Sequence, residues 1–303
     1  MTANKTTKPV SKRLKKFTLI MISILVILEL GTRLTRISDF PLYEANNKIG
    51  YIPKANQSGK FLWTHDWKFN QYHMGAEAFK PSNADDVLLV GDSIVLGGNQ
   101  LKQSERLGPT LAKKLNLAVW PISAGSWAMR NELIYLNSNP DVVKNIDTFI
   151  FVWNSGDFEK ASSWACELTH PQQAPISAFL YVFQKYVYNW QACSGEIKPA
   201  FLVADGDWHQ ELKAFIDSPA MKHKNVKAFL YPDINEENDA KLMKDKLDSH
   251  INEIHQAGIT NVISVGHDSR WNARYYRDGI HPSGKGNEVL ADIMAKPEAL
   301  AVF

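Results

Sequence analysis

Five short, largely apolar stretches follow one another after residue 85, and segments with helical spacing separate them. The stretches are residues 87–90, 117–122, 148–153, 226–232 and 261–265. A strand that is apolar on both faces belongs to a sheet that is covered on both sides, which is typical of parallel sheets. The alternation of such strands with helices predicts an α/β fold with a mostly parallel five-stranded sheet.

Helical spacing is found in four segments, residues 106–115, 131–136, 239–256 and 284–294. Residues 158–225, between the third and fourth strands, are too long for a plain crossover and hold an aromatic-rich helix at 177–190. This insertion is either an extra helix packed on the domain or a cap over the carboxyl edge of the sheet. Its position favours the cap, because insertions that follow strand ends lie near the ligand crevice of open α/β sheets.

The N-terminal residues carry a membrane-type pattern. An apolar run, FTLIMISILVIL at residues 17–28, follows a basic tail at residues 1–16. The run is short for a membrane span, which needs roughly 17–25 residues, unless the span continues past Glu29. We expect an uncleaved signal anchor at residues 17–31, because no small-residue cleavage site follows; a cleaved secretory signal and a buried core helix are the alternatives. Since positive charge is denser before the run, the tail would be cytoplasmic and the remainder would lie on the periplasmic side of the inner membrane.

The overall composition is that of a globular protein. The chain has 303 residues, is 45% hydrophobic and 22% charged, and carries a formal net charge of +2. We expect one domain at residues 86–303, preceded by an extended wrapping segment at residues 32–85. No basic stripe with interleaved aromatics is present, so nucleic-acid binding is not expected. The sequence does not set the oligomeric state.

Two cysteines, Cys166 and Cys193, fall within the insertion. In an exported domain an even number of cysteines is compatible with a disulfide. Two buried free thiols are the other possibility, and the sequence leaves both open.

The first predicted strand ends in the turn GDSIVLGG, which places a hydroxyl at Ser93. The carboxyl edge of a parallel sheet is where ligands bind, and backbone N–H groups there can stabilise a developing oxyanion. A serine hydroxyl is a weak nucleophile unless a base takes its proton. Asp92, beside Ser93, fits a structural hydrogen-bond acceptor better than a catalyst.

A candidate base lies near the other end of the domain, in the segment RDGIHPSGKG. Asp278 and His281 are three residues apart, and Pro282 suits the start of a helix. In such a turn the carboxylate can accept the Nδ1 proton of the imidazole, which leaves Nε2 free to act as a base. The order Ser, Asp, His along the chain is one of several that build this arrangement.

The segments Gly91-Asp92-Ser93 and Asp278-x-x-His281-Pro282 together resemble the first and last blocks of the GDSL/SGNH hydrolase superfamily, in its membrane-anchored bacterial form. In layout the resemblance extends over residues 45–300. It implies a flavodoxin-like three-layer α/β/α sandwich and acyl-ester chemistry without a cofactor. It also implies that Ser93 is the nucleophile, that His281 is the base and that Asp278 orients the imidazole.

The resemblance further implies an oxyanion hole made by the amide of Ser93, the amide of Gly125 and the side chain of Asn154. The third block of the family reads Gly-x-Asn-Asp, whereas this chain has Asn154-Ser-Gly156-Asp157. The side-chain amide is therefore displaced by two residues. Asn154 either still reaches the hole or merely caps a turn.

Three tryptophans lie close in sequence to this predicted site. Trp127 and Trp164 are candidates for flat apolar platforms that bind the C–H face of a sugar ring. Trp153 is a weaker candidate, because its neighbours in the strand are apolar and are expected to be buried. The alternative is packing in the core or in the insertion, which explains most tryptophans in proteins.

Other histidines do not form a recognisable site. His267 and Asp268 also follow a predicted strand, but adjacent side chains seldom form a catalytic pair, so we interpret them as loop residues. The remaining histidines lack the spacing of metal ligands, and no metal is expected.

These features predict an SGNH-type serine esterase. Its expected substrate is a small ester or an acylated carbohydrate, with an O-acetyl group on envelope or exported polysaccharide as the main candidate. An O-acyltransferase with the same Ser-His-Asp set is one alternative. A non-catalytic carbohydrate-binding or assembly subunit, suggested by the altered third block, is the other.

Overall fold

The computed structural model describes residues 12–188, 193 and 195–296. Most of the predicted basic tail, residues 1–11, lies outside the described residues. So do residues 189–190 of the predicted aromatic-rich helix and residues 297–303 of the predicted domain.

The centre of the molecule is a five-stranded sheet with strand order β6-β5-β7-β8-β9 and parallel pairing throughout. Its strands are β5 (Asp86–Gly91), β6 (Ala118–Ser123), β7 (Thr148–Trp153), β8 (Asn225–Leu230) and β9 (Asn261–Ser264). The predicted α/β class and the five-stranded sheet are confirmed. Because the chain runs from β5 to one edge and then returns to the other side of β5, the strand order reverses next to β5, where open α/β sheets bind ligands.

Two apolar cores lie on the two faces of this sheet. Along β5, Leu88 and Val90 pack into one core, and Val87 and Leu89 pack into the other. This alternation follows from the two-residue period of a strand, and it explains why the strand is apolar at every position. All four side chains are at most 2% exposed.

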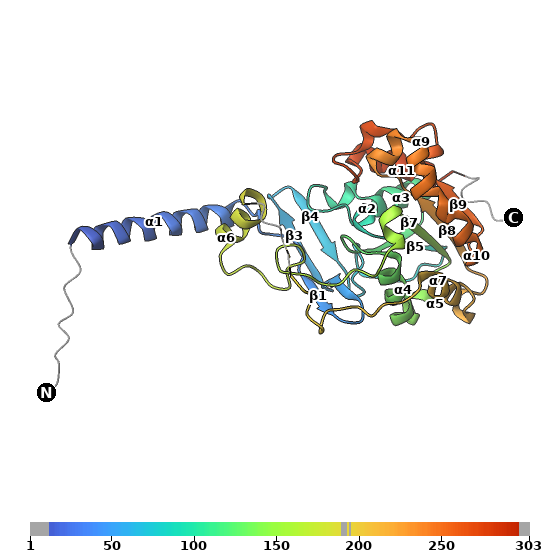
Figure 1. Cartoon of the computed structure of the whole chain (residues 1–303), viewed down its shortest axis with the longest axis horizontal. Coiled ribbons are helices and arrows are strands. Elements are labelled where there is room, and N and C mark those ends of the chain that lie inside the picture. Colours follow the sequence, from blue (N-terminus) through green and yellow to red (C-terminus); the bar gives the residue numbers. More distant parts are fainter. Residues whose placement is uncertain (1–11, 189–192, 194, 297–303) are drawn as a thin grey trace.

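Helices cover both faces and complete three layers (Figure 1). The first core is covered by α4 (Met129–Ser138), α5 (Pro140–Lys144), α7 (Trp208–Ile216) and α10 (Ile251–Gln256). The second core is covered by α2 (Ser93–Leu96), α3 (Leu107–Leu115) and α11 (Gly284–Met294). Helix α8 (Ile234–Asn238) precedes α9 (Ala240–Lys246).

The prediction of one continuous helix at residues 239–256 is wrong. The segment forms α9, a 3₁₀ turn at Asp248–His250 and then α10. The break follows Leu247, which is fully buried, and Asp248 accepts a hydrogen bond from the Nε2 atom of His267 at 2.8 Å. Helical spacing alone could not reveal this break.

The segment at residues 32–85 contains two antiparallel hairpins that the sequence did not reveal. The first pairs β1 (Tyr43–Asn46) with β2 (Gly50–Pro53), and the second pairs β3 (Gln57–Phe61) with β4 (His65–Phe69). The second hairpin turns through Leu62 and Trp63, which both have positive φ angles of 47° and 67°. Such angles normally require glycine or asparagine, so the turn lacks the usual sequence signal.

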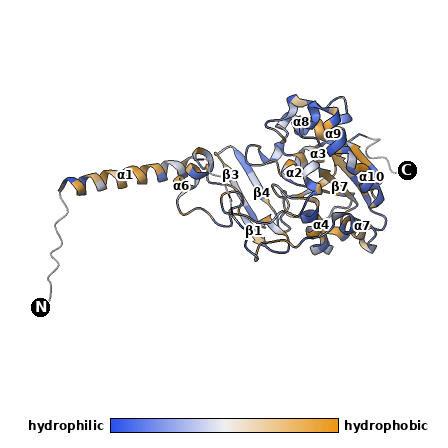
Figure 2. Cartoon of the chain, viewed as in Figure 1, coloured by the Kyte–Doolittle hydropathy of each residue, from blue (hydrophilic) through white to orange (hydrophobic). Residues whose placement is uncertain are grey.

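Helix α1 (Lys12–Leu34) projects away from the rest of the molecule (Figure 1). Its surface is predominantly apolar (Figure 2), and most of its large apolar side chains are exposed. Within the described residues it is the one helix that is long and apolar enough to cross a membrane, judged by length and composition.

The insertion at residues 158–225 begins at the carboxyl end of β7 and carries α6 (Ala178–Val182), which continues as a π-helical segment at Phe183–Val187. Cys166 and Cys193 form a disulfide with a Cα–Cα distance of 5.3 Å. Of the two states that the sequence left open for the cysteines, the structure contains the disulfide.

Candidate active site

The turn after β5 positions the Ser93 hydroxyl. Gly91 ends the strand in a place where a Cβ atom would lie 2.6 Å from the Val95 side chain and 3.0 Å from a carbonyl oxygen of β7. Asp92 caps the short helix α2 by accepting a hydrogen bond from the Ile94 amide at 2.8 Å. A glycine for close approach and an aspartate as a cap together turn the chain sharply enough to leave Ser93 at the sheet edge.

A second turn holds the imidazole of His281. Asp278 accepts hydrogen bonds from the backbone amides of Ile280 at 3.0 Å and His281 at 2.8 Å. Both oxygens of the same carboxylate lie 2.9 Å from the Nδ1 atom of His281. The cap of the following helix α11 is Ser283, which accepts a hydrogen bond from the Gly286 amide, so the helix begins two residues after Pro282.

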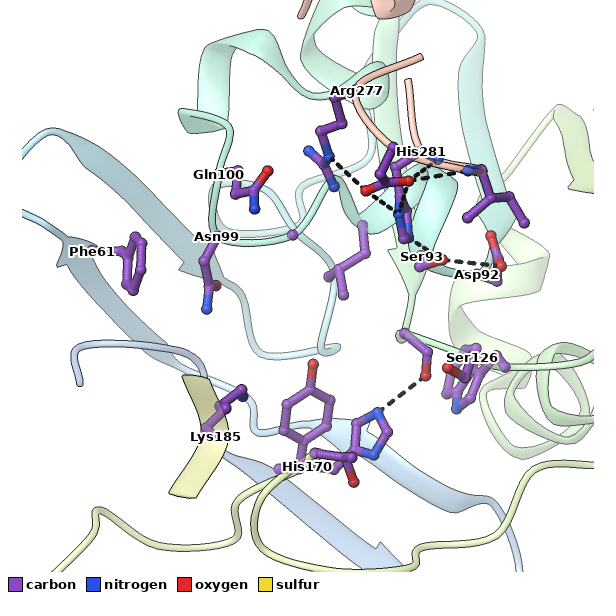
Figure 3. A pocket seen from close by; sticks show the side chains of 18 of the residues that line it. Phe61, Asp92, Ser93, Asn99, Gln100, Ser126, His170, Lys185, Arg277 and His281 are labelled. Carbon is purple, nitrogen blue, oxygen red and sulfur yellow. Dashed lines mark hydrogen bonds and ion pairs between the residues drawn. The ribbon is translucent and has the colours of Figure 1, made fainter. Parts of the chain in front are cut away.

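The two turns meet. The Nε2 atom of His281 lies 2.9 Å from the Oγ atom of Ser93, although 188 positions separate the two residues (Figure 3). Ser93, His281 and Asp278 thus form a continuous chain of hydrogen bonds, in the order that allows a proton to move from the hydroxyl to the imidazole.

The charge on Asp278 fits this arrangement. Partial burial alone would raise the pKa of this carboxyl, but hydrogen bonds from the two backbone amides and from the imidazole bring the pKa below its ordinary value. Asp278 is therefore ionised at neutral pH. An ionised carboxylate at Nδ1 fixes the tautomer in which Nε2 carries no proton and can act as a base.

The Ser93 hydroxyl has a competing neighbour, an oxygen of Asp92 at 3.2 Å. Burial raises the pKa of Asp92 above its ordinary value, because the side chain is shielded from water. The imidazole of His281 is the closer partner of the hydroxyl, at 2.9 Å. Asp92 acts as the structural acceptor that its sequence position suggested, since its other oxygen caps α2.

Arg277 is a component of the site that the sequence did not indicate. One terminal nitrogen donates to the carbonyl of Gly97 at 2.8 Å, and the Nε atom lies 3.6 Å from Asp278. The side chain lines the same cavity as Ser93. It therefore joins the loop after α2 to the turn that carries His281. Its only sequence signal is that it precedes Asp278.

The loops that follow β6 and β7 place Gly125 and Asn154 at the wall of this cavity. Asn154 Oδ1 caps a 3₁₀ turn by accepting a hydrogen bond from the Gly156 amide at 2.8 Å. Its Nδ2 atom donates to carboxylate oxygens of Asp92 at 3.1 Å and Asp157 at 3.0 Å. The side chain thus caps a turn, and its two amide protons are directed to carboxyl groups beside Ser93.

Three carboxyl groups are buried close to Ser93: those of Asp92, Glu132 and Asp157, each at most 4% exposed. Burial raises the pKa of Glu132 and of Asp157 well above the ordinary values, and for Asp157 the nearby Asp92 and Glu132 raise it further. Glu132 accepts one hydrogen bond, from the indole nitrogen of Trp153 at 2.7 Å, and its other oxygen has no partner.

Glu132→Gln should change how stability depends on pH. A carboxyl whose pKa is raised in the folded state binds its proton more tightly there than in the unfolded chain, so its contribution to stability is lost as pH rises above the ordinary value near 4.5. Glutamine keeps the acceptor for Trp153 and has no charge to bury. We expect the free energy of unfolding of the variant, minus that of the wild type, to be about 1 kcal/mol or more larger at pH 8 than at pH 5.

The measurement is urea unfolding of the full chain in detergent at both pH values. Glu159→Gln, at an exposed glutamate, serves as the control and should leave the pH dependence unchanged. A Glu132→Gln difference that does not vary between pH 5 and pH 8 would show that Glu132 is not protonated in the folded state.

The cavity in front of Ser93 has a volume of about 990 Å³. The N-terminal segment contributes Tyr43, Phe61 and Leu62 to its wall, and the insertion contributes residues 168–170, Lys185 and Tyr186 (Figure 3). Part of the insertion therefore lies over the carboxyl edge of the sheet. Both segments reach the site from outside the α/β layers.

His170 is a second component of this wall that the sequence did not indicate. Its ring stacks on Tyr51 with centroids 3.8 Å apart, and its Nε2 atom lies 3.2 Å from the carbonyl of Gly125. Burial lowers the pKa of His170 to about 4, so the ring is neutral at neutral pH. His170 therefore holds the loop that carries Gly125 and adds no charge to the cavity.

The expectation that Trp127 and Trp164 form exposed platforms is corrected by the structure. Trp127 is 2% exposed and donates its indole hydrogen to the carbonyl of Tyr51 at 2.7 Å. Trp164 is 8% exposed, donates to the carbonyl of His170 and packs against Phe201. The first hairpin and the insertion cover these indoles, so Trp127 contributes only an edge to the cavity and Trp164 is not among the lining residues.

Other candidate residues lie in different surroundings. His267 contacts Asp248, and Asp268 forms ion pairs with Arg270 and Lys296. Across residues 12–188, 193 and 195–296, no group of three or more His, Cys, Asp or Glu side chains is arranged to hold a metal ion.

Comparison with solved structures finds proteins with a similar fold. They include a member of the lipolytic G-D-S-L family from Veillonella parvula (11% identity, 70% of this chain and 96% of that one, TM-score 0.41). The psychrotrophic esterase EstA from Pseudoalteromonas sp. matches at 11% identity over 70% of this chain and 94% of its own, with a TM-score of 0.42. A carbohydrate esterase family 2 enzyme with a carbohydrate-binding domain, from Corynascus thermopiles (Myceliophthora fergusii), matches at 13% identity over 73% and 68%, with a TM-score of 0.42.

No protein-family model matches the sequence, and no curated protein matches it significantly.

Proposed function

We propose that this chain is a serine esterase of the SGNH type that cleaves acyl esters, with O-acetyl groups on envelope or exported polysaccharide as the main substrate. The observation that carries the proposal is the hydrogen-bonded chain from Ser93 through His281 to Asp278, at the wall of an open cavity. The motifs at residues 91–93 and 278–282, which resemble the SGNH superfamily, support it.

In the proposed reaction Ser93 Oγ attacks the ester carbonyl while His281 Nε2 takes its proton. The backbone amides of Ser93 and Gly125 donate hydrogen bonds to the resulting oxyanion. Asn154 would join them only by giving up one of its two carboxylate partners. His281 then returns the proton to the departing alcohol, which leaves the acyl group on Ser93. Water, activated by the same imidazole, releases the acid and restores the hydroxyl.

The same steps serve an O-acyltransferase if a sugar hydroxyl replaces water in the second half of the reaction. The cavity, at about 990 Å³, has room for both an ester and an acceptor, which is why transfer stays a candidate. A carbohydrate-binding or assembly subunit is the candidate from another class. The commitment of the Asn154 amide to Asp92 and Asp157 is the observation in its favour.

We also propose that α1 is a retained anchor in the inner membrane, with the N-terminus in the cytoplasm and the α/β domain in the periplasm. Its length and composition, and the basic residues at its start, support this orientation. The disulfide between Cys166 and Cys193 suits an oxidising compartment.

The test is acetate release from an O-acetylated polysaccharide by the full chain in detergent, with and without an unacetylated oligosaccharide as acceptor. We expect acetate in both reactions. Acetyl groups recovered on the oligosaccharide instead of as acetate would assign a transferase. Binding of the polysaccharide without turnover of any ester would assign the non-catalytic subunit.

A further inference from the structure

We propose that α6 and the π-helical segment after it, residues 176–187, lie in the membrane interface beside α1. The cavity then opens at the bilayer surface and takes its ester from an amphiphile held in the membrane. This inference rests on the proposed ester cleavage, and it favours an ester on a membrane-held molecule over one on a free polysaccharide.

The first observation is a polar connection between α1 and α6. The carboxylate of Glu29 accepts hydrogen bonds from the Ser177 hydroxyl at 2.8 Å and from the amides of Ala178 at 3.0 Å and Phe179 at 3.1 Å. Arg33 pairs with Glu29 and donates to the carbonyl of Ile176 at 2.8 Å. Glu29 thus caps α6 and holds its start beside α1, before α1 ends (Figure 1).

The second observation is the length of the apolar helix. At 1.5 Å per residue, residues 17–28 span roughly 18 Å, whereas the hydrocarbon core of a bilayer is about 30 Å thick. Continuing to Leu34 gives roughly 27 Å. The helix therefore matches a bilayer only if Glu29 lies inside the outer boundary of the hydrocarbon. Its contacts with α6 and Arg33 satisfy the charge there, and α6 is brought to the same depth.

The third observation is the surface of α6 and its continuation. Ile176, Leu180, Phe183 and Val187 are 95%, 54%, 41% and 67% exposed, respectively. Ile176 lies just before α6, Leu180 lies in it, and Phe183 and Val187 lie in the π-helical segment that continues it. A stripe of large apolar side chains is unfavourable in water and favourable in lipid. Its attachment to the one described helix that could span a membrane selects a bilayer as its partner.

The fourth observation marks the level of the headgroups. Trp63, in the turn of the second hairpin, donates its indole hydrogen to the carbonyl of Leu34, at the end of α1, at 2.7 Å. The guanidinium of Arg36 lies 4.5 Å above its ring, and the indole is 57% exposed. Tryptophan and arginine together are typical of the membrane–water interface.

The cavity connects this level to the nucleophile. From Ser93 it extends to Ile37, Phe61 and Leu62 on one side and to Lys185 and Tyr186 on the other. The first set adjoins the end of α1 and the Trp63 turn, and the second belongs to the π-helical segment after α6. The mouth is thus formed by the two segments that the preceding observations place at the bilayer surface.

The test of insertion uses the full chain in phosphatidylcholine and phosphatidylglycerol vesicles. The native cysteines form a disulfide, so Leu180→Cys provides a single thiol for an environment-sensitive NBD label. Leu202→Cys is the matched control, because Leu202 is equally exposed, at 53%, but lies outside α6. We expect doxyl-labelled lipid to quench the label at residue 180 at least about twofold and to leave the label at residue 202 unchanged. Absent quenching at residue 180, or equal quenching at both, overturns the proposal.

The test of substrate supply compares two esters, a long-chain nitrophenyl ester embedded in vesicles and water-soluble nitrophenyl acetate. Leu180→Asp should lower the rate on the embedded ester about tenfold and change the rate on the soluble ester less than about twofold, because a buried charge opposes insertion. Leu202→Asp should affect neither. Equal losses on both esters would contradict the proposal. Failure of the wild type on the soluble ester would instead refute the proposed function, while the quenching result would still stand on its own.

Discussion

Ser93→Ala is expected to lower kcat for nitrophenyl acetate about 10⁶-fold, the scale seen when the nucleophile of a serine hydrolase is removed. The hydroxyl is the atom that forms the bond to the acyl carbon, and no described neighbour supplies another nucleophile in line with His281. Because Ser93 starts the short helix α2 and its amide stays in place, alanine should leave the fold and the cavity unchanged.

The measurement is hydrolysis by the full chain in detergent, with far-UV circular dichroism to compare the folds. Ser155→Ala is the matched control, since Ser155 lies at the same sheet edge without lining the cavity. We expect the control to retain wild-type activity. Hydrolysis by Ser93→Ala at an unchanged rate would refute the assignment of the nucleophile.

His281→Ala should cause a loss of similar size, because the hydroxyl then has no base to take its proton. Asp92, the other neighbour at 3.2 Å, is a poor substitute, since its buried carboxyl already serves as the cap of α2. Imidazole added to the buffer should restore part of the activity by occupying the space of the missing ring. Such a rescue distinguishes a lost base from a disturbed fold.

The matched control is His267→Ala, which removes the imidazole of the other histidine–carboxylate contact that follows a strand, with Asp248 at 2.8 Å. His267 is 61% exposed in its side chain and should be dispensable. A larger loss in His267→Ala than in His281→Ala would move the proposed base to the other loop.

The sheet could be predicted from the sequence because its central strands β5 and β7 are almost entirely buried on both faces. An unbroken apolar stretch as short as residues 148–153 can form little other than a buried strand. The helix at residues 284–294 has the same bounds in the prediction and in the structure. The hairpins at residues 43–69 were not predictable in this way. The second hairpin turns at Leu62 and Trp63 without glycine, and the Trp63 indole is held by the carbonyl of Leu34, which no local sequence signal reveals.

The meeting of Ser93 and His281 could also be anticipated, because both turns follow elements whose ends lie at one edge of a parallel sheet. The burial of Trp127 could not, because it depends on a carbonyl group of β2 that belongs to the unpredicted hairpin. Arg277 and His170 were missed for a similar reason: their partners, Gly97 and Gly125, are backbone carbonyls, which leave no trace in the sequence.

The separation of 188 positions between Ser93 and His281 has a consequence for the life of the molecule. During synthesis Ser93 emerges long before His281, which lies between β9 and α11 near the end of the described chain. The proposed site is therefore complete only after most of the chain has been synthesised. A chain that is still incomplete would therefore lack the arrangement that the proposed hydrolysis requires.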